Sequence, residues 1–272
     1  MRDSLLISST LTNSEAWLGL SKHDVEQLEQ VDESLMRRFL EVGQGVPKEM
    51  LYLELGFRPI RFTIMIRKIM FLQYILNEES DSLINQVFRA QSEFPTRSDF
   101  FLEVQEVMDD LDIGLSLEDI KSLSIDMLQN FAKKQADKKA LNFLNILKQK
   151  HSKVMHIVHN GLEMQDYLLP QNISSIKLAK FIFSARTRML DLGANFSKKY
   201  GANAKCKLGC DALDNQEHLM HCRKLPNTDI QSKNENVEYE DLFSSKLENQ
   251  IKVGVILERN LKERRKLEKE IC

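Results

Sequence analysis

Three cysteines and one histidine lie close together near the C-terminal end of the chain, in the stretch CKLGCDALDNQEHLMHC. Their spacing is Cys206-x3-Cys210-x7-His218-x3-Cys222. A structural zinc ion takes four sulfur or nitrogen ligands in a tetrahedron, commonly as two close pairs joined by a longer loop. Gly209 allows a tight turn within the first pair, and helix residues i and i+4, which share a face, suit the second. The pattern predicts one Zn²⁺ ion in a closed, structural site.

His221 is an alternative nitrogen ligand to His218. It adjoins Cys222, so on a helix it would point to another face, and the spacing favours His218. The alternative to a zinc site is that the three cysteines are free thiols beside a surface histidine. Cys272, the fourth cysteine, is the last residue, and this clustering is unlike a disulfide framework. We therefore expect an intracellular protein, in the nucleus or the cytoplasm.

Charge is unevenly distributed along the chain although the formal net charge is only -2. Residues 97–120 are strongly acidic, whereas 121–160 and 177–207 are rich in Lys and Arg. Basic groups beside a zinc module can neutralise phosphates, although most basic runs are simply solvated surfaces. The residues predicted to contact nucleic-acid phosphates are Arg186, Arg188, Lys198, Lys199, Lys205 and Lys207.

Two other groups of polar residues are weaker candidates for a metal-binding or catalytic site. His151, His156 and His159 form a cluster without a neighbouring Cys or carboxylate, which favours a solvent-facing loop. Asp109 and Asp110 form a carboxylate pair of the kind that holds catalytic metals, but further acidic residues surround them, which indicates a solvated helix face. The chain has no P-loop, dinucleotide-binding motif or catalytic triad pattern.

Composition and periodicity predict an all-α fold, with a helical bundle-like body, a small CCHC zinc knuckle and a C-terminal helix. Hydrophobic residues make up 42% of the chain, and only 10 Gly and 5 Pro interrupt it. In the first long helix, apolar residues at spacings of three and four place Glu29 and Asp32 outside. Residues 60–76 are apolar nearly all round, which predicts a buried helix. A basic helix over 124–150 exposes Lys148, and a short strand is expected at 154–158.

The expected organisation has four parts: a first helical region at 1–76, a helical body with a basic face at 77–195, the knuckle at 196–226, and a linker with the C-terminal helix at 227–272. The polar, Asn-rich stretch 225–240 indicates a flexible linker. No uncharged stretch approaches the roughly 20 apolar residues that span a bilayer, so no membrane association is expected.

Several phrases of the sequence resemble one protein family in order along the chain. They are NSEAWLGLSKHDVEQLEQVDESLMRRFL, PKEMLYLELGFRPIRFTIMIRKIMFLQYIL, KQKHSKV, ARTRMLDLGANFSKKYG and CKLGC with NQEHLMHC. They are similar to the region after the polymerase domain in non-long-terminal-repeat (LINE-type) retrotransposon reverse transcriptases. The resemblance implies that this region holds element RNA or target DNA, with a CCHC knuckle and a thumb-like start near residues 14–41.

The catalytic residues of that family do not carry over to this chain. The polymerase site needs an aromatic-x-Asp-Asp motif, and Val107-Met108-Asp109-Asp110 lacks the aromatic residue. We therefore expect a nucleic-acid-binding protein with zinc, without catalysis and without a small-molecule substrate. The alternative is a zinc-stapled helical scaffold whose partner is a protein.

Overall fold

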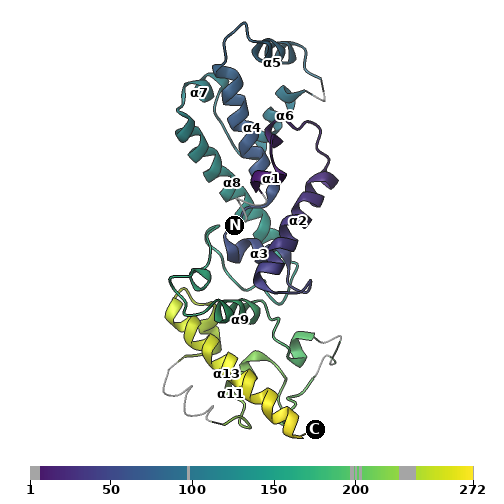
Figure 1. Ribbon diagram of the computed structural model, residues 1–272, viewed down its shortest axis with the longest axis vertical. Helices are drawn as coiled ribbons and strands as arrows, with labels where there is room; N and C mark the ends of the chain where they lie inside the picture. The colour runs from purple at the N-terminus through teal and green to yellow at the C-terminus, as the bar shows by residue number, and fades with distance from the viewer. Residues whose placement is uncertain are drawn as a thin grey trace. The chain divides into compact units, whose positions relative to one another are not determined.

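The computed structural model describes residues 7–96, 99–196, 199, 201, 204–226 and 237–271. Figure 1 labels the main helices along the chain. The helical elements are α1 (Ser8–Thr10), η2 (Ser14–Ala16), α2 (Lys22–Leu40), α3 (Lys48–Leu55), α4 (Ile60–Asn77), α5 (Leu83–Glu93), α6 (Phe100–Asp110), α7 (Leu117–Ser122), α8 (Ile125–Lys148), η3 (Asp166–Leu168), α9 (Ile176–Arg186), η4 (Gly193–Phe196), α11 (Gln216–His221), η5 (Tyr239–Phe243) and α13 (Leu247–Ile271). Strand pairing in these ranges is limited to isolated bridges. The predicted all-α fold is confirmed.

The chain forms two compact units. Unit 1 contains residues 1–36 and 57–146, and unit 2 contains 37–56 and 147–272. The structure thus divides the chain differently from the four consecutive parts expected from the sequence, because each unit combines segments that are far apart in the chain. The expected linker falls mostly on 227–236, outside the described residues.

Helix α4 is the centre of unit 1, as its apolar sequence predicts. It packs against η2, α5, α6 and α7, and its buried residues include Ile60, Ile64 and Leu72. A capping box begins α2, in which Asp24 Oδ2 accepts from Ser21 N at 2.9 Å and Ser21 Oγ accepts from Asp24 N at 3.2 Å.

The facing predicted for α2, with its apolar residues inside and its acidic residues outside, is wrong at four positions. Glu29 and Asp32 are buried rather than exposed, whereas Val31 and Phe39 are exposed. The burial of the Glu29 carboxylate is explained by Arg61 of α4, whose guanidinium donates to both carboxylate oxygens at 2.7 and 2.8 Å. A buried charge is tolerated when it is paired in this way.

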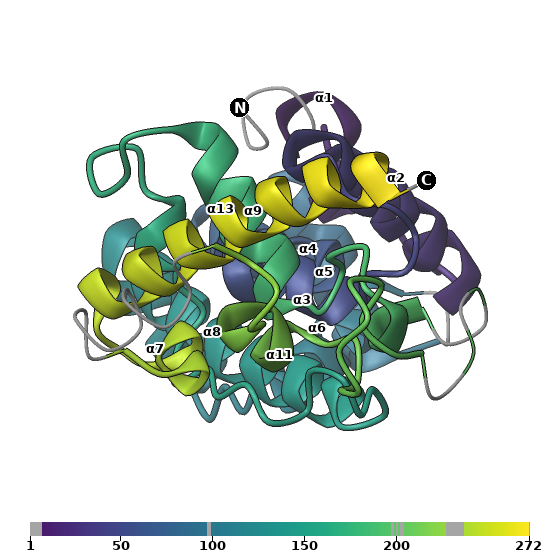
Figure 2. The same ribbon diagram turned by 90° about the horizontal axis from the view of Figure 1, so that it is seen from below.

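In unit 2, the long helix α13 lies against α9 and α11, as Figure 2 shows. Gly254 of α13 permits the close approach to α9, because a Cβ atom there would meet Ile182 Cγ1 at 2.5 Å. Buried residues of α13 include Val253, Leu257 and Leu261. This packing gives unit 2 a core of its own.

The segment between α8 and α9 differs from its prediction. Residues 154–158 form a turn followed by irregular backbone rather than a strand, with Val154 and Ile157 buried. Further on, Gln165 N donates to Glu54 O at 2.9 Å, beside the isolated bridge between Leu55 and Met164. Long-range pairing with α3 therefore holds this segment in place of a local strand.

None of the helices in the described ranges combines the length and apolar composition that a membrane crossing requires.

Candidate metal centre

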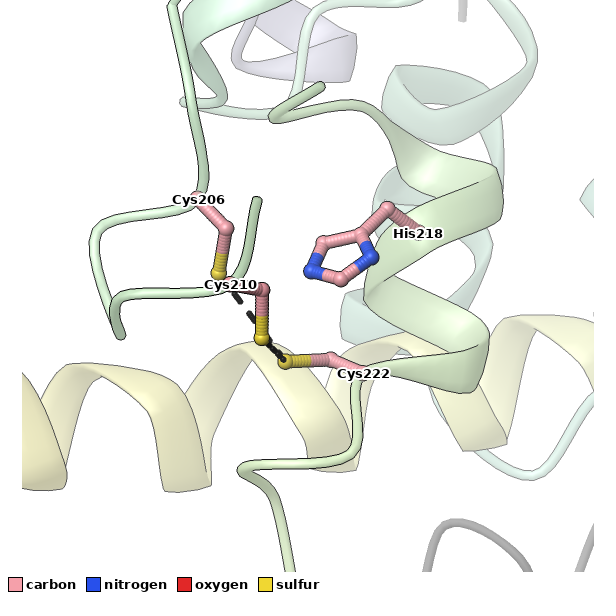
Figure 3. Close-up of side chains that lie close together, drawn as sticks. All are labelled: Cys206, Cys210, His218 and Cys222. Carbon is pink, nitrogen blue, oxygen red and sulfur yellow. Dashed lines mark hydrogen bonds between the residues drawn. The ribbon is translucent and has the colours of Figure 1, made fainter. Parts of the chain in front are cut away.

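Residues 204–226, here called the Cys3His module, bring the four predicted ligands together. Cys206 lies beside the isolated bridge that joins Lys205 to Leu213. Gly209, at a φ of +82°, shapes the turn to Cys210, and its N–H donates to Cys206 O at 3.0 Å. His218 and Cys222 come from α11 and its C-terminal end. Figure 3 shows the His218 imidazole beside the three sulfur atoms.

The spacing of the ligand atoms fits a tetrahedral metal ion. All four lie within 4.8 Å of one another. Cys222 Sγ is 3.9 Å from Cys206 Sγ and 3.6 Å from Cys210 Sγ. A tetrahedron with metal–sulfur bonds of about 2.3 Å has edges of about 3.8 Å. His218 Nε2 is buried without a hydrogen-bond partner, which a coordinated ion would supply. The cluster is thus compatible with binding a metal ion, and it leaves out His221.

The protonation of the site also depends on its burial. Burial lowers the pKa of the His218 imidazole, which favours the neutral form that binds metals. Burial raises the pKa of the Cys222 thiol to about 12. A thiolate at this position therefore requires a nearby positive charge, as a metal ion would provide.

The Cys3His module is anchored to the helices of unit 2. Arg264 of α13 pairs with the buried carboxylate of Asp214, with Nη2 at 2.9 Å from Oδ2. Asn260 of α13 donates to Leu219 O at 3.0 Å. Gln216 Nε2 donates to Ala185 O, at the end of α9, at 2.7 Å. The module is therefore integrated with α9 and α13 by buried polar contacts.

The six basic residues predicted to contact phosphate occupy different environments. Lys199, Lys205 and Lys207 are exposed, and Lys205 pairs with Asp211. Arg188 is half-buried and lies 3.9 Å from Glu217. Lys198 lies outside the described residues.

The prediction that Arg186 contacts a nucleic-acid phosphate is wrong, because the side chain is buried. It is only 2% exposed, and Glu54 engages its guanidinium within unit 2. A phosphate at the surface therefore cannot reach it. Arg223 and Lys224 are also exposed and were not among the predicted residues, although their position directly after Cys222 indicates them.

The structure also contains a buried polar cluster around Glu54 that was not predicted from the sequence. Its carboxylate accepts from Tyr167 OH at 2.5 Å, from His159 Nε2 at 3.0 Å, and from Arg186 Nη2 at 3.0 Å. Lys148 approaches the other ring nitrogen of His159 at 3.4 Å. The outward positions predicted for Lys148 and for His159 are therefore wrong, since both are buried.

The Glu54 carboxylate stays ionised because the Arg186 guanidinium pairs with it. Burial alone would raise the pKa of Glu54, but Arg186 and His159 outweigh this effect and lower the pKa to about 2. Burial raises the pKa of Tyr167, and the Glu54 carboxylate raises it further. The cluster joins α3 to α9 and the segment after α8, and its contacts indicate a structural role.

Comparisons of the chain with family models, with curated proteins and with solved structures found no match.

Proposed function

We propose that this protein binds RNA or DNA through exposed basic residues of a Cys3His module that a Zn²⁺ ion holds together. The observation that carries the proposal is the position of four exposed basic side chains around the ligand cluster, at Lys205, Lys207, Arg223 and Lys224. Basic groups on a rigid scaffold can contact successive phosphates and release their counterions. A chain that keeps three free thiols together suits a reducing compartment, the nucleus or the cytoplasm.

Zinc is the metal that this ligand set favours. Three thiolates and one imidazole in a closed tetrahedron are typical of structural zinc sites, whereas Mg²⁺ and Ca²⁺ prefer oxygen ligands. All four positions are filled by side chains, so the ion would have a structural role. Metal analysis of the purified protein should find one zinc ion per chain, and Cys210→Ser should abolish it.

The resemblance to the region behind the polymerase domain of LINE-type reverse transcriptases supports the same function, and it remains a prediction. It implies element RNA or target DNA as the partner. The polymerase motif is absent from the sequence, so the isolated chain should not extend a primer on a template. Any extension would refute this part of the proposal.

Salt-dependent binding tests the proposal most directly. RNA and single-stranded DNA should bind with an affinity that falls as salt rises, by a log–log slope of about -0.7 per phosphate contact. The triple substitution of Lys207, Arg223 and Lys224 by Ala should reduce that slope by about 2. A matched triple substitution of exposed lysines in unit 1, at Lys121, Lys134 and Lys138, should leave the slope within experimental error. Absent binding, salt-independent binding or an equal loss in both variants would refute the proposal.

A protein-binding scaffold is the second candidate, and one observation favours it. Leu83 and Val87 of α5, and Phe94 directly after it, are 76%, 47% and 78% exposed, and the spacing of Leu83 and Val87 places them on one side of the helix. Contiguous exposed apolar side chains often mark protein-interaction surfaces. A protein partner that stays bound after nuclease treatment and is lost on Val87→Glu would favour this candidate.

A further inference from the structure

One side of α13 faces away from the core of unit 2 and carries a row of cations, here called the α13 basic face. They are Arg259, Lys262, Lys266 and Lys269. Spacings of three and four residues place them on one side of the helix. Arg259 is half-buried and the three lysines are exposed, whereas Leu257 and Arg264, on the opposite side, are buried. The row is therefore accessible to a partner.

The charge of the α13 basic face suits an anionic partner. A surface hollow of about 520 Å³ lies on this face, and the residues that line it all belong to α13. Five of them are cations, since Arg265 joins the row, and two are carboxylates, Glu258 and Glu263, so the hollow has a net charge of +3. A surface of this kind attracts polyanions.

The cations of this face are available to such a partner. Lys262 pairs with Glu258 at 2.8 Å, and Lys266 pairs with Glu263 at 2.6 Å. Exposed ion pairs of this type are weak and screened by salt. Of the other cations that line the hollow, none has a carboxylate partner among the described residues. Little interaction energy is therefore lost when phosphates replace the present partners.

The side chains of α13 disfavour most other polyanionic partners. The helix has no aromatic residue, so unpaired bases have nothing to stack on. Val255 is the one apolar residue that lines the hollow, whereas helices that lie on membranes insert several large apolar side chains. Lysine is also depleted in protein interfaces. A nucleic-acid duplex, with its bases stacked inside and its phosphates outside, needs none of these features.

The dimensions of α13 fit double-stranded DNA. An α-helix with its side chains is about 10–12 Å across, and the major groove of B-DNA, about 12 Å wide, admits one. The deep, narrow major groove of an RNA duplex does not. The basic face extends over about 15 Å of helix, a length over which each strand of B-DNA carries about four phosphates. Lys and Arg also donate to guanine O6 and N7 in this groove.

From these features we propose that the α13 basic face binds the major groove of double-stranded DNA. Its cations donate to phosphate oxygens and to the edges of guanine. The inference extends the proposed function from the Cys3His module to a second surface, and it rests on that function for the choice of a nucleic acid over other polyanions.

Fluorescence anisotropy of the metal-loaded protein with a DNA duplex of about 20 base pairs, roughly two helical turns, measures this contact. Substitution of the four cations of the basic face by Gln should reduce the log–log salt slope by about 3–4, at about 0.9 per phosphate contact. The triple substitution of Lys207, Arg223 and Lys224 by Ala should leave the duplex slope unchanged, because these residues belong to the other surface. Absent duplex binding, or an equal loss in both variants, would overturn the inference.

Removal of the two carboxylates gives a test that a folding defect cannot imitate. The double substitution Glu258→Gln and Glu263→Gln should raise the duplex affinity several-fold, since it frees Lys262 and Lys266 and removes two charges that repel phosphate. An unchanged or lower affinity would count against α13 as the binding surface.

Dimethyl sulfate identifies the groove, because it methylates guanine N7 in the major groove and adenine N3 in the minor groove. Bound protein should protect N7 and leave N3 reactive, and the variant with four Gln substitutions should lose this protection. Protection of N3 instead, or an equal affinity for an RNA duplex of the same length, would refute binding in the major groove. Displacement of the DNA at equal charge by polyglutamate, or by vesicles of phosphatidylserine and phosphatidylcholine in equal parts, would show that the face selects negative charge alone.

The two proposals fail separately. The variant with four Gln substitutions should keep its zinc and its binding to RNA and single-stranded DNA, which also shows that it is folded. Single-strand binding without duplex binding would overturn only the inference about α13. Duplex binding that depends on the α13 basic face, without single-strand binding at the Cys3His module, would overturn only the proposed function.

Discussion

Removal of the metal should disrupt unit 2 beyond the Cys3His module. Structural zinc contributes an apparent binding free energy of about 10–16 kcal/mol in small modules. The whole unfolding free energy of a typical domain is about 5–15 kcal/mol. A zinc ion bound at this cluster would therefore contribute as much as the total stability expected for unit 2.

The buried anchors determine how far the disruption spreads. If the module opened alone, the buried Arg264 would lose Asp214 and keep only Glu268, at 2.7 Å from its Nε, at a cost of about 3 kcal/mol, the lower end for a broken buried ion pair. Loss of the hydrogen bonds from Asn260 and from Gln216 would cost about 1 kcal/mol each. Separate opening thus costs roughly 5 kcal/mol in all. We expect α9 and α13 to loosen together with the module.

The position of the one tryptophan makes this measurable. Trp17 lies in unit 1, so its fluorescence reports on that unit, whereas far-UV circular dichroism reports on both. Chelation, or Cys210→Ser, should reduce the helical signal in part and leave Trp17 fluorescence unchanged. Hydrogen exchange should accelerate in peptides from α9 and α13. Cys272→Ser, which alters the only cysteine outside the cluster, should leave the metal content intact.

Either of two results would refute this reasoning. Faster exchange confined to residues 204–226, with α9 and α13 still protected, would show that the anchors are weaker than their burial implies. A change in Trp17 fluorescence on chelation would show that the units do not respond independently to loss of the metal.

Two further predictions concern Glu54. Glu54→Gln should destabilise unit 2 by about 3–5 kcal/mol, because it leaves Arg186 buried without its counter-ion. Chemical denaturation measures this loss, with Glu41→Gln as the matched control. The Glu41 side chain is 74% exposed and pairs with Lys180, so the control should lose less than about 1 kcal/mol. The pH dependence follows from the lowered pKa: the contribution of the Glu54 carboxylate is complete above about pH 4.5, and about 3 kcal/mol of it is lost as the pH falls toward about 2. The stability difference between the parent and Glu54→Gln should therefore shrink over that interval, and a difference that stayed constant would contradict the assignment.

The metal ligands could be predicted from the sequence because they lie in one short segment. A turn and a single helical turn are enough to bring four ligands together, so spacing alone carries the information. The choice of His218 over His221 follows in the same way, since only His218 shares a helix face with Cys222. Local geometry of this kind does not depend on the rest of the fold.

The Glu54 cluster could not be predicted in the same way. Glu54 and Arg186 are 132 positions apart, and nothing near either residue indicates its partner. His159 was assigned to a loop in solvent because no carboxylate is close to it in sequence, yet Glu54 approaches it across 105 positions. Glu29 of α2 was placed outside for the same reason, because periodicity identifies apolar stripes but not a buried charge with a distant partner.

The metal site and η5 depend on the same few contacts. Gln216 of the Cys3His module donates to Ala185 O, and the next residue, Arg186, donates to Leu242 O at 2.6 Å. Tyr239 OH donates to Gln216 Oε1 at 3.0 Å, and the Tyr239 ring contacts Phe243. Loss of a bound metal would release Gln216, and with it the support of Tyr239. Hydrogen exchange should therefore accelerate in η5 of metal-free protein, although no metal ligand belongs to that element.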